Sequence, residues 1–182
     1  MAYITVNETG TFPALILSTV VGNGAPGNTW PNADGNLAAD TGSNGTSILN
    51  VTCLQDVTIT NSTGIFSWTD FCSASINKVT TPSDNEISTN IVLEPNVFFG
   101  VSGDADSAEA YGVSGLSQNR VEVAFRLQMN NSANIGANTP ANTYWYAGRG
   151  YISSVAPTVS PDSPVWVSPL TIAVNGDMDS GS

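Results

Sequence analysis

The stretch "NRVEVAFRLQMN", residues 119–130, alternates apolar and polar side chains with a regularity that decides the fold class. On an extended strand, one face would carry Val121, Val123, Phe125, Leu127 and Met129, and the other Glu122, Ala124, Arg126 and Gln128. A period of two predicts a half-buried β-strand whose apolar face contributes to a core. The polar face includes Arg126, and Arg120 stands just before the run, although the chain has only 4 basic residues. This face therefore meets bulk water, a neighbouring subunit or the interior of an assembly.

Further strand patterns recur along the chain and are separated by turn-forming residues. The expected strands are 3–6, 13–21, 47–60, 65–76, 86–94, 96–101, 143–155 and 163–176. Residues 61–64, "NSTG", have the composition of a turn, so we expect 47–60 and 65–76 to form a hairpin. The one expected helix is "DADSAEAYGV", 104–113, capped by Asp104 or Ser107. Many short strands with at most one short helix predict an all-β, antiparallel β-sandwich or barrel.

A long loop in the N-terminal half interrupts the strand pattern. Residues 22–47 are rich in Gly, Pro and Asn, and neither helical nor strand periodicity is present there. A segment of this length inside a domain is typically disordered or is a binding arm. Trp30 and Leu37 supply apolar anchors, so we expect an arm that becomes ordered against a partner. We expect the whole chain, 1–182, to form a single domain that ends in a short flexible tail at 177–182.

The charge of the chain excludes several partners. Fifteen carboxylates and 4 basic residues give a formal net charge of -11. Binding to nucleic acid depends on Lys and Arg side chains that displace counterions from phosphates, so we expect no tight binding of DNA. An anionic membrane surface would repel the chain in the same way. We see neither the pattern of a signal peptide nor an apolar run of membrane-spanning length, and we expect no association with a membrane.

Residues that commonly carry catalysis or bind metals are scarce. The sequence has no histidine and 2 cysteines, which excludes imidazole-based triads and most zinc sites. Asp104, Asp106 and Glu109 have the spacing of calcium ligands, but the glycine and distal glutamate of an EF-hand loop are missing, so we favour a capped helix start. A pair of carboxylates of the glycosidase type is not marked by any pattern. We expect no enzyme activity, no cofactor and no metal.

Two groups of residues leave alternatives open. Cys53 and Cys72 form a disulfide if they lie on neighbouring strands, or remain free thiols in a reducing compartment. An aromatic group close to the C-terminus could stack on a sugar or could belong to the core or an interface, where strand aromatics are more common. Its members are Tyr144, Trp145, Tyr146, Tyr151 and Trp166.

The order of these segments resembles the major tail tube protein of tailed bacteriophages. The resemblance rests on "NRVEVAFRLQMN" and on the C-terminal "YWYAGRGYISSVAPTVSPDSPVWVSPLTIAVNGDM". In that family a penultimate strand, a bend and a last strand close the subunit, and residues 150–155, 156–164 and 165–176 are similar to these pieces. The early long loop and the single helix also fit.

The resemblance implies a structural virion protein, assembled in the host cytoplasm, whose hexameric rings stack into the tail tube. The long loop would reach a neighbouring ring, and other tail proteins (sheath, baseplate or terminator) would be partners. A lumen that conducts a polyanion during DNA ejection should be acidic, which agrees with the net charge of the chain. The acids that we expect to face the lumen are Asp56, Asp70, Glu86, Glu94 and Glu122. Arg126 would then be paired at a subunit boundary or at the pore.

Two other functions remain compatible with the sequence. A capsid cement or decoration protein would share its composition. An extracellular carbohydrate-binding module would explain the aromatic residues and the N-x-S/T triplets. Electron microscopy would separate tubes or rings from capsid-bound knobs, and a glycan array would test sugar binding.

Overall fold

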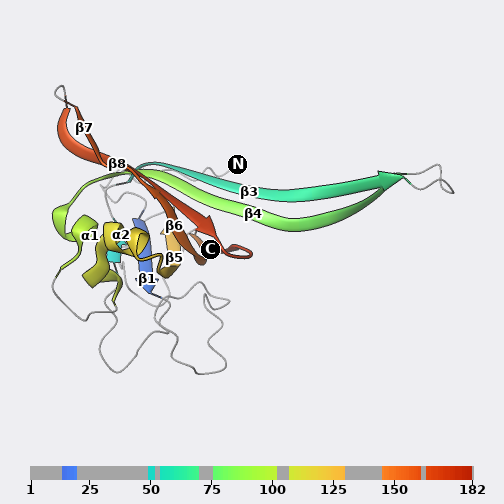
Figure 1. Ribbon diagram of the computed structural model, residues 1–182, viewed down its shortest axis with the longest axis horizontal. Coiled ribbons are helices and arrows are strands. Elements are labelled where there is room, and N and C mark those ends of the chain that lie inside the picture. The colour runs from blue at the N-terminus through green and yellow to red at the C-terminus, as the bar shows by residue number, and fades with distance from the viewer. Residues whose placement is uncertain are drawn as a thin grey trace.

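The computed structural model describes residues 14–19, 49–51, 54–69, 76–101, 107–129, 145–160 and 163–181 (Figure 1). The strands are β1 Ala14–Thr19, β2 Leu49–Val51, β3 Leu54–Thr69, β4 Ile76–Val92, β5 Glu122–Gln128, β6 Trp145–Val155, β7 Thr158–Ser160, β8 Ser163–Val174 and β9 Asp179–Gly181. The helices are α1 Pro95–Phe99 and α2 Ala108–Gln118. Several sequence predictions, including those for residues 3–6 and 22–47, lie outside the described residues.

The strands form one 9-stranded sheet in which every pairing is antiparallel. The main order is β2-β1-β5-β6-β8-β4-β3, with β7 beside β8 and β9 beside β6. The prediction of an antiparallel all-β fold is confirmed. The sheet is open rather than closed into a barrel, because β2 and β3 stand at opposite ends of this order.

The stretch 119–130 supplies the strand near the middle of this sheet. β5 pairs with β1 on one side and with β6 on the other. Val123, Phe125 and Leu127 are fully buried, as the alternation predicts. Arg126 and Gln128 are buried as well, so both faces of this strand are covered at its C-terminal end.

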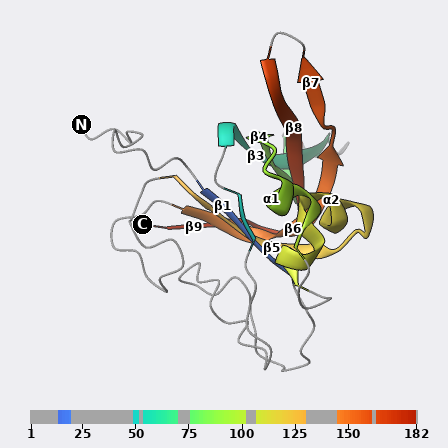
Figure 2. The ribbon, with the colours of Figure 1, turned by 90° about the vertical axis from the view of Figure 1, so that its left-hand side faces the viewer.

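Two helices cover one face of the sheet, whereas the sequence predicted at most one (Figure 2). α2 starts where expected: the Ser107 hydroxyl accepts a hydrogen bond from the Ala110 N–H at 3.2 Å and caps the helix. α1 follows β4 directly and has Pro95 in its first turn, where a missing N–H costs nothing. The sequence analysis assigned 96–101 to a strand because five-residue helices leave no periodic signal.

The two helices pack closely because Gly100, which follows α1, meets Gly112 of α2. Gly100 and Gly112 have φ angles of 83° and 61°, in the region that favours glycine. A Cβ on Gly112 would lie 2.3 Å from the Gly100 N atom and 2.7 Å from the Phe98 O atom. Gly112 also interrupts the helical backbone of α2. These contacts position Phe98 over the sheet, where it is buried.

The core lies between the helices and the covered face of the sheet. Its fully or nearly fully buried members are Leu15, Leu17, Leu49, Val51, Leu54, Ile87, Ile91, Phe98, Ala108, Val113, Leu116, Val123, Phe125, Leu127, Ile152, Leu170 and Ile172. Every main strand of the sheet and both helices contribute, so the described segments share one core.

The predicted hairpin of 47–60 with 65–76 is wrong. β3 continues through "NSTG" to Thr69, and its partner is β4, which pairs Ile59 with Ile87 and Phe66 with Val79. The turn-like residues instead mark an irregularity in the ladder between Thr63 and Ile65. A Cβ on Gly64 would lie 2.0 Å from the Thr81 Oγ1, so the glycine lets the Thr81 side chain cross the ribbon.

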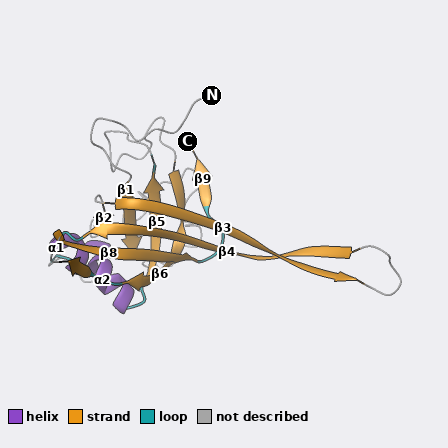
Figure 3. Cartoon of the chain, turned by 90° about the horizontal axis from the view of Figure 1, so that it is seen from above, coloured by secondary structure: helices purple, strands orange, loops and turns teal. Residues whose placement is uncertain are grey.

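The paired strands β3 and β4 extend well beyond the rest of the sheet (Figure 3). β8 pairs with β4 from Glu86 to Val92, so residues 76–85 of β4 have no strand neighbour except β3 among the residues that the structure describes. We call this projection, residues 61–69 and 76–85, the arm. Figures 1 and 3 show it as a twisted two-stranded ribbon directed away from the helices.

The C-terminal segments form strands as the sequence predicted, with two additions. β6 and β8 pair with each other, and the bend between them includes the short strand β7. Residues 179–181, expected to belong to a flexible tail, form β9 and pair with Trp145–Ala147 of β6. The end of the chain therefore contributes to the sheet.

Candidate assembly surfaces

Three of the acids that the sequence analysis selected lie on one face of the sheet, the face opposite the helices. Register places Glu86 of β4 beside Ala173 of β8, Ala173 beside Tyr151 of β6, and Tyr151 beside Glu122 of β5. Directly paired residues point to the same side of a sheet, so Glu86 and Glu122 share a transverse row. Three strand spacings separate them by roughly 14 Å. Two distant parts of the sequence thus place carboxylates in line.

Asp56 lies on the same face, one strand beyond Glu86. It pairs with Asn90, whose backbone N–H donates to Asp56 Oδ1 at 2.8 Å and whose Nδ2 donates to Asp56 Oδ2 at 2.9 Å. Glu122 is held in a similar way, because Asn175 Nδ2 donates to its Oε1 at 3.0 Å. Both carboxylates are oriented by amide donors and neither is paired with a cation in these contacts.

The sequence analysis missed a fourth acid on this face. Asp84 pairs with Ser62 on β3 and stands two residues before Glu86, so its exposed side chain shares the side of Glu86. The spacing of two residues between Asp84 and Glu86 could have predicted this shared side from the sequence. We call Asp56, Asp84, Glu86 and Glu122 the acidic face.

The remaining selected residues are not placed with this group. Glu94 follows the last paired residue of β4 and serves as the N-cap of α1, with an exposed side chain. Asp70 lies outside the described residues, as do Trp30, Leu37 and the whole loop 22–47. Cys53 and Cys72 also lie outside them, so their pairing stays open.

Arg126 is buried inside the chain, and the expectation that it faces a boundary or the pore is wrong. Its side chain is 3% exposed, and its guanidinium carbon lies 5.5 Å from the centre of the Trp145 ring. Within the described residues its Nε has no hydrogen-bond partner. Burial lowers the pKa of Arg126 from its ordinary value, because desolvation disfavours the charged form. The cation–π contact partly offsets this cost.

Those aromatic residues near the C-terminus that the structure describes do not form one platform. Trp145 is buried, whereas Tyr146, next to it on β6, points to the opposite side of the sheet and packs against the core. Tyr151 is exposed on the acidic-face side. Trp166 lies on β8 beside α1, and Tyr144 is outside the described residues. These described side chains therefore do not lie together as a surface on which a sugar could stack.

The arm exposes apolar side chains on both of its faces. Phe66 is 58% exposed and Trp68 43%, and their rings stack with centroids 5.9 Å apart. Val79 pairs with Phe66 and extends this patch. Ile65 and Ile76 are exposed on the other face. The sequence analysis missed this surface because it placed residues 65–76 in an ordinary hairpin with 47–60 and assigned Val79 to no strand.

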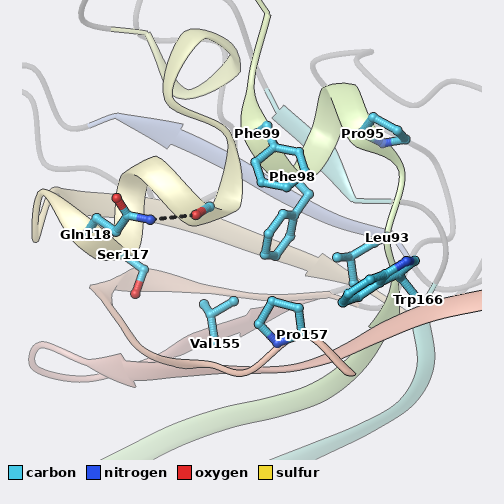
Figure 4. A pocket seen from close by; sticks show the side chains of 10 residues that line it. Leu93, Pro95, Phe98, Phe99, Ser117, Gln118, Val155, Pro157 and Trp166 are labelled. Carbon is cyan, nitrogen blue, oxygen red and sulfur yellow. Dashed lines mark hydrogen bonds between the residues drawn. The ribbon is translucent and has the colours of Figure 1, made fainter. Parts of the chain in front are cut away.

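A pocket of about 620 Å³ opens where the helices meet the β7–β8 hairpin (Figure 4). Its lining consists of Leu93, Pro95, Phe98, Phe99, Ser114, Ser117, Gln118, Val155, Pro157 and Trp166. No lining residue is charged, and the polar groups gather on α2, where Gln118 Nε2 donates to Ser114 Oγ at 2.9 Å. Phe99 is 70% exposed and Trp166 52%. The pocket is therefore an open apolar surface rather than a sealed part of the core.

The part of the chain that the structure describes contains neither a cluster of metal ligands nor a membrane-spanning helix. No three His, Cys, Asp or Glu side chains are grouped there as metal ligands. Among the same residues, no helix has the length and hydropathy that a membrane span requires.

Comparison with known proteins finds similarity in structure only. No family model and no curated protein matches the chain. The structure is similar to a chain in the tail of an empty gene transfer agent (GTA) particle with C6 symmetry, with a TM-score of 0.48 and 15% identity over 74% of this chain and 87% of that one. For the SPP1 tail tube the TM-score is 0.47, with 13% identity over 92% and 77% of the two chains. For the anti-feeding prophage (AFP) baseplate it is 0.47, with 5% identity over 98% and 97%. All three TM-scores are below 0.5, and none of the three identities exceeds 15%.

Proposed function

We propose that this chain is a structural subunit of a phage-type tail tube, and that its copies form hexameric rings stacked around an acidic lumen. The observation that carries the proposal is the acidic face, where carboxylates from β3, β4 and β5 lie on one side of a continuous sheet. The sequence resemblance to tail tube proteins supports the same role. The proposed location is the virion tail, after assembly in the host cytoplasm.

The acidic face suits a channel that conducts DNA without binding it. A wall of carboxylates repels phosphates, so passing DNA stays mobile. Burial of Arg126 removes one cation from the surface that DNA would meet. Six copies would carry six times the net charge of -11, so their mutual repulsion must be outweighed by apolar contacts and reduced by salt, which screens charges beyond about 8 Å at physiological ionic strength.

The open sheet suits a subunit that is completed by its neighbours. Within the described residues, β3 has a strand partner only on the β4 side and exposes its other edge over 16 residues. A long unpaired edge is a template for association with another chain. Repeated contact between copies around a rotation axis closes a ring and leaves no edge exposed.

The loop 22–47 supplies a second contact in this proposal. Trp30 and Leu37 would become buried against a neighbouring ring, and other tail proteins would meet the ends of the tube. Deletion of residues 24–45 should leave a folded chain that does not stack. Normal tubes from the deleted chain, seen by electron microscopy, would contradict this role of the loop.

The acidic face is tested by one charge reversal and a matched control. Glu86→Lys places a cation on the proposed lumen wall, where it can hold a phosphate. Glu109→Lys makes the same change of charge on an exposed position of α2, in the layer of helices. Particles with Glu86→Lys should eject DNA more slowly than both the wild type and the Glu109→Lys control.

Images and ejection rates together decide the proposal. Tubes with six-fold rings and slowed ejection support it. Knobs bound to capsids would favour a cement or decoration protein instead. Equal ejection rates for Glu86→Lys and Glu109→Lys would show that the acidic face does not line the channel.

A further inference from the structure

We expect a partner to stabilise the arm. A two-stranded ribbon by itself is marginally stable in water, because it buries little apolar surface. Among the described residues, the part of β4 that precedes Glu86 has β3 as its one strand neighbour, and the side chains of Phe66, Trp68 and Val79 stay exposed. Solvent-exposed apolar patches of this kind commonly mark protein contacts.

The rings of Phe66 and Trp68 form a protruding knob. They belong to alternate positions of β3, so both point to the same side of the ribbon, and their planes are 24° apart at a centroid distance of 5.9 Å. Val79 lies directly opposite Phe66 on β4 and widens the base of this knob. Asn77, which pairs with Trp68, bears no charge, and the charged neighbour Lys78 pairs with Ser67 on the other side of the ribbon.

The pocket is complementary to this knob, because it is an uncharged cavity lined by aromatic and other apolar side chains. Its volume of about 620 Å³ accommodates two stacked aromatic side chains, and its lining includes the aromatic rings of Phe98, Phe99 and Trp166. Phe98 and Phe99 meet edge to face, with centroids 5.0 Å apart and planes at 89°. Such a surface favours further aromatic contacts, since offset and edge-to-face pairs stabilise beyond the area that they bury.

A single chain does not fill its own pocket with its own arm. Figures 1 and 3 show the arm extending along the long axis in one direction, while α1 and α2 lie at the other end of the molecule, where Figure 1 also shows β7. An occupant that comes from an arm must therefore belong to a second copy. The contact joins two different surfaces, so it repeats head to tail and yields rings or filaments.

We propose that the arm of one copy docks in the pocket of the next, with Phe66 and Trp68 between the helices and the β7–β8 hairpin. This inference rests on the proposed self-assembly and names the residues that make the contact. Neither the pocket lining nor the knob carries a charge. Although each copy has a net charge of -11, no pair of like charges is therefore brought together within this contact.

The area available is consistent with one part of a stable interface. Aromatic side chains bury about 150–250 Å² each when fully covered, so the exposed parts of Phe66, Trp68, Phe99 and Trp166 supply roughly 500 Å². A standard interface buries about 1,200–2,000 Å² in total. The remaining area would come from the length of the arm and from the unpaired edge of β3.

The head-to-tail geometry permits a complementation experiment with full-length chains. An arm variant carries Phe66→Ser and Trp68→Ser, and a pocket variant carries Phe99→Ser and Trp166→Ser. A control carries Val159→Ser and Val165→Ser, which remove exposed apolar side chains of β7 and β8 outside both surfaces. Circular dichroism checks the fold of each, and Phe99→Ser alone replaces the pocket variant if that variant does not fold.

Light scattering after size exclusion gives the oligomeric state. The wild type and the control should form multi-copy assemblies, and each variant alone should remain monomeric. An equal mixture of the two variants should give dimers that grow no further, because each dimer contains one intact arm in one intact pocket and no second usable pair.

Each other outcome overturns the inference in a recognisable way. A wild type that stays monomeric removes both this contact and the proposed tube. Assembly of the wild type and of both variants leaves the tube intact and shows that the arm does not dock in the pocket. A mixture without dimers, or a small apolar molecule recovered from the pocket of the assembled chain, also excludes the contact.

Discussion

The two halves of strand β4 differ in burial although they belong to one continuous strand. From Glu86 to Val92, β4 pairs with β3 and β8 and alternates buried Ile87, Thr89 and Ile91 with more exposed residues. From Ile76 to Thr80, the same strand pairs with β3 and with no other described strand, and its residues Ile76 and Val79 are exposed. A β-strand pattern is therefore insufficient to locate a core.

The difference between the halves lies in the layer above the sheet. Ile87 and Ile91 share the core with Phe98, Val113 and Leu116, which the two helices supply. The arm has no such layer in the described structure. An isoleucine becomes a core residue where a second layer excludes water, and remains a contact surface where none does.

The largest effect is expected when the same substitution, isoleucine to alanine, is made in each half of β4. Ile87→Ala removes a side chain that is 1% exposed, and should lower the free energy of unfolding by about 2–5 kcal/mol. Ile76→Ala changes a side chain that is 63% exposed and should change this free energy by at most about 0.5 kcal/mol. Urea titrations of both variants check the comparison, and equal losses would show that the arm belongs to the folded core of the monomer.

A second prediction concerns the glycine contact that holds the helical layer together. Gly112→Ala should lower the free energy of unfolding by about 2–4 kcal/mol, from backbone strain and from overlap with Gly100 and Phe98. Gly176→Ala is the control: its φ is 96° as well, but nothing lies within 4 Å of the added Cβ, so about 1–2 kcal/mol is expected. Thermal unfolding of both variants measures the difference. Equal effects would mean that close packing of α1 on α2 contributes little.

A third, smaller effect concerns the start of the helical layer. Ser107→Ala removes the oxygen that accepts the Ala110 N–H and should cost about 1 kcal/mol. Ser67→Ala, on the arm, should be nearly neutral in the monomer. Chemical denaturation of the two variants measures the free energy of unfolding that each hydroxyl contributes. No loss in Ser107→Ala would show that the cap does not stabilise the helical layer.

The smallest expected effect is at buried Arg126. Arg126→Met replaces a desolvated guanidinium by an apolar side chain of comparable length, and should change the free energy of unfolding by about 1 kcal/mol or less, towards greater stability. The burial of this arginine then has no stabilising role. A loss above about 3 kcal/mol would indicate instead that its other contacts within the chain are strong.

Part of the candidate assembly surface was predictable from local patterns. Glu86 and Glu122 were selected because each belongs to an alternating segment, and register then places them in one row. Asp84 could have been found by the same rule. The pocket was not predictable, since Phe99, Ser114 and Trp166 come from three segments whose meeting depends on the packing of α1 and α2.

The sequence by itself determined the antiparallel all-β class, the course of β5 and the helix that begins after Ser107. These features follow from a period of two and from a capping residue, both of which act over a few neighbouring positions. Tertiary structure decided the partner of β3, the projection of the arm and the burial of Arg126. Strand partners and covering layers depend on segments that are distant in sequence, and no local pattern of residues specifies them.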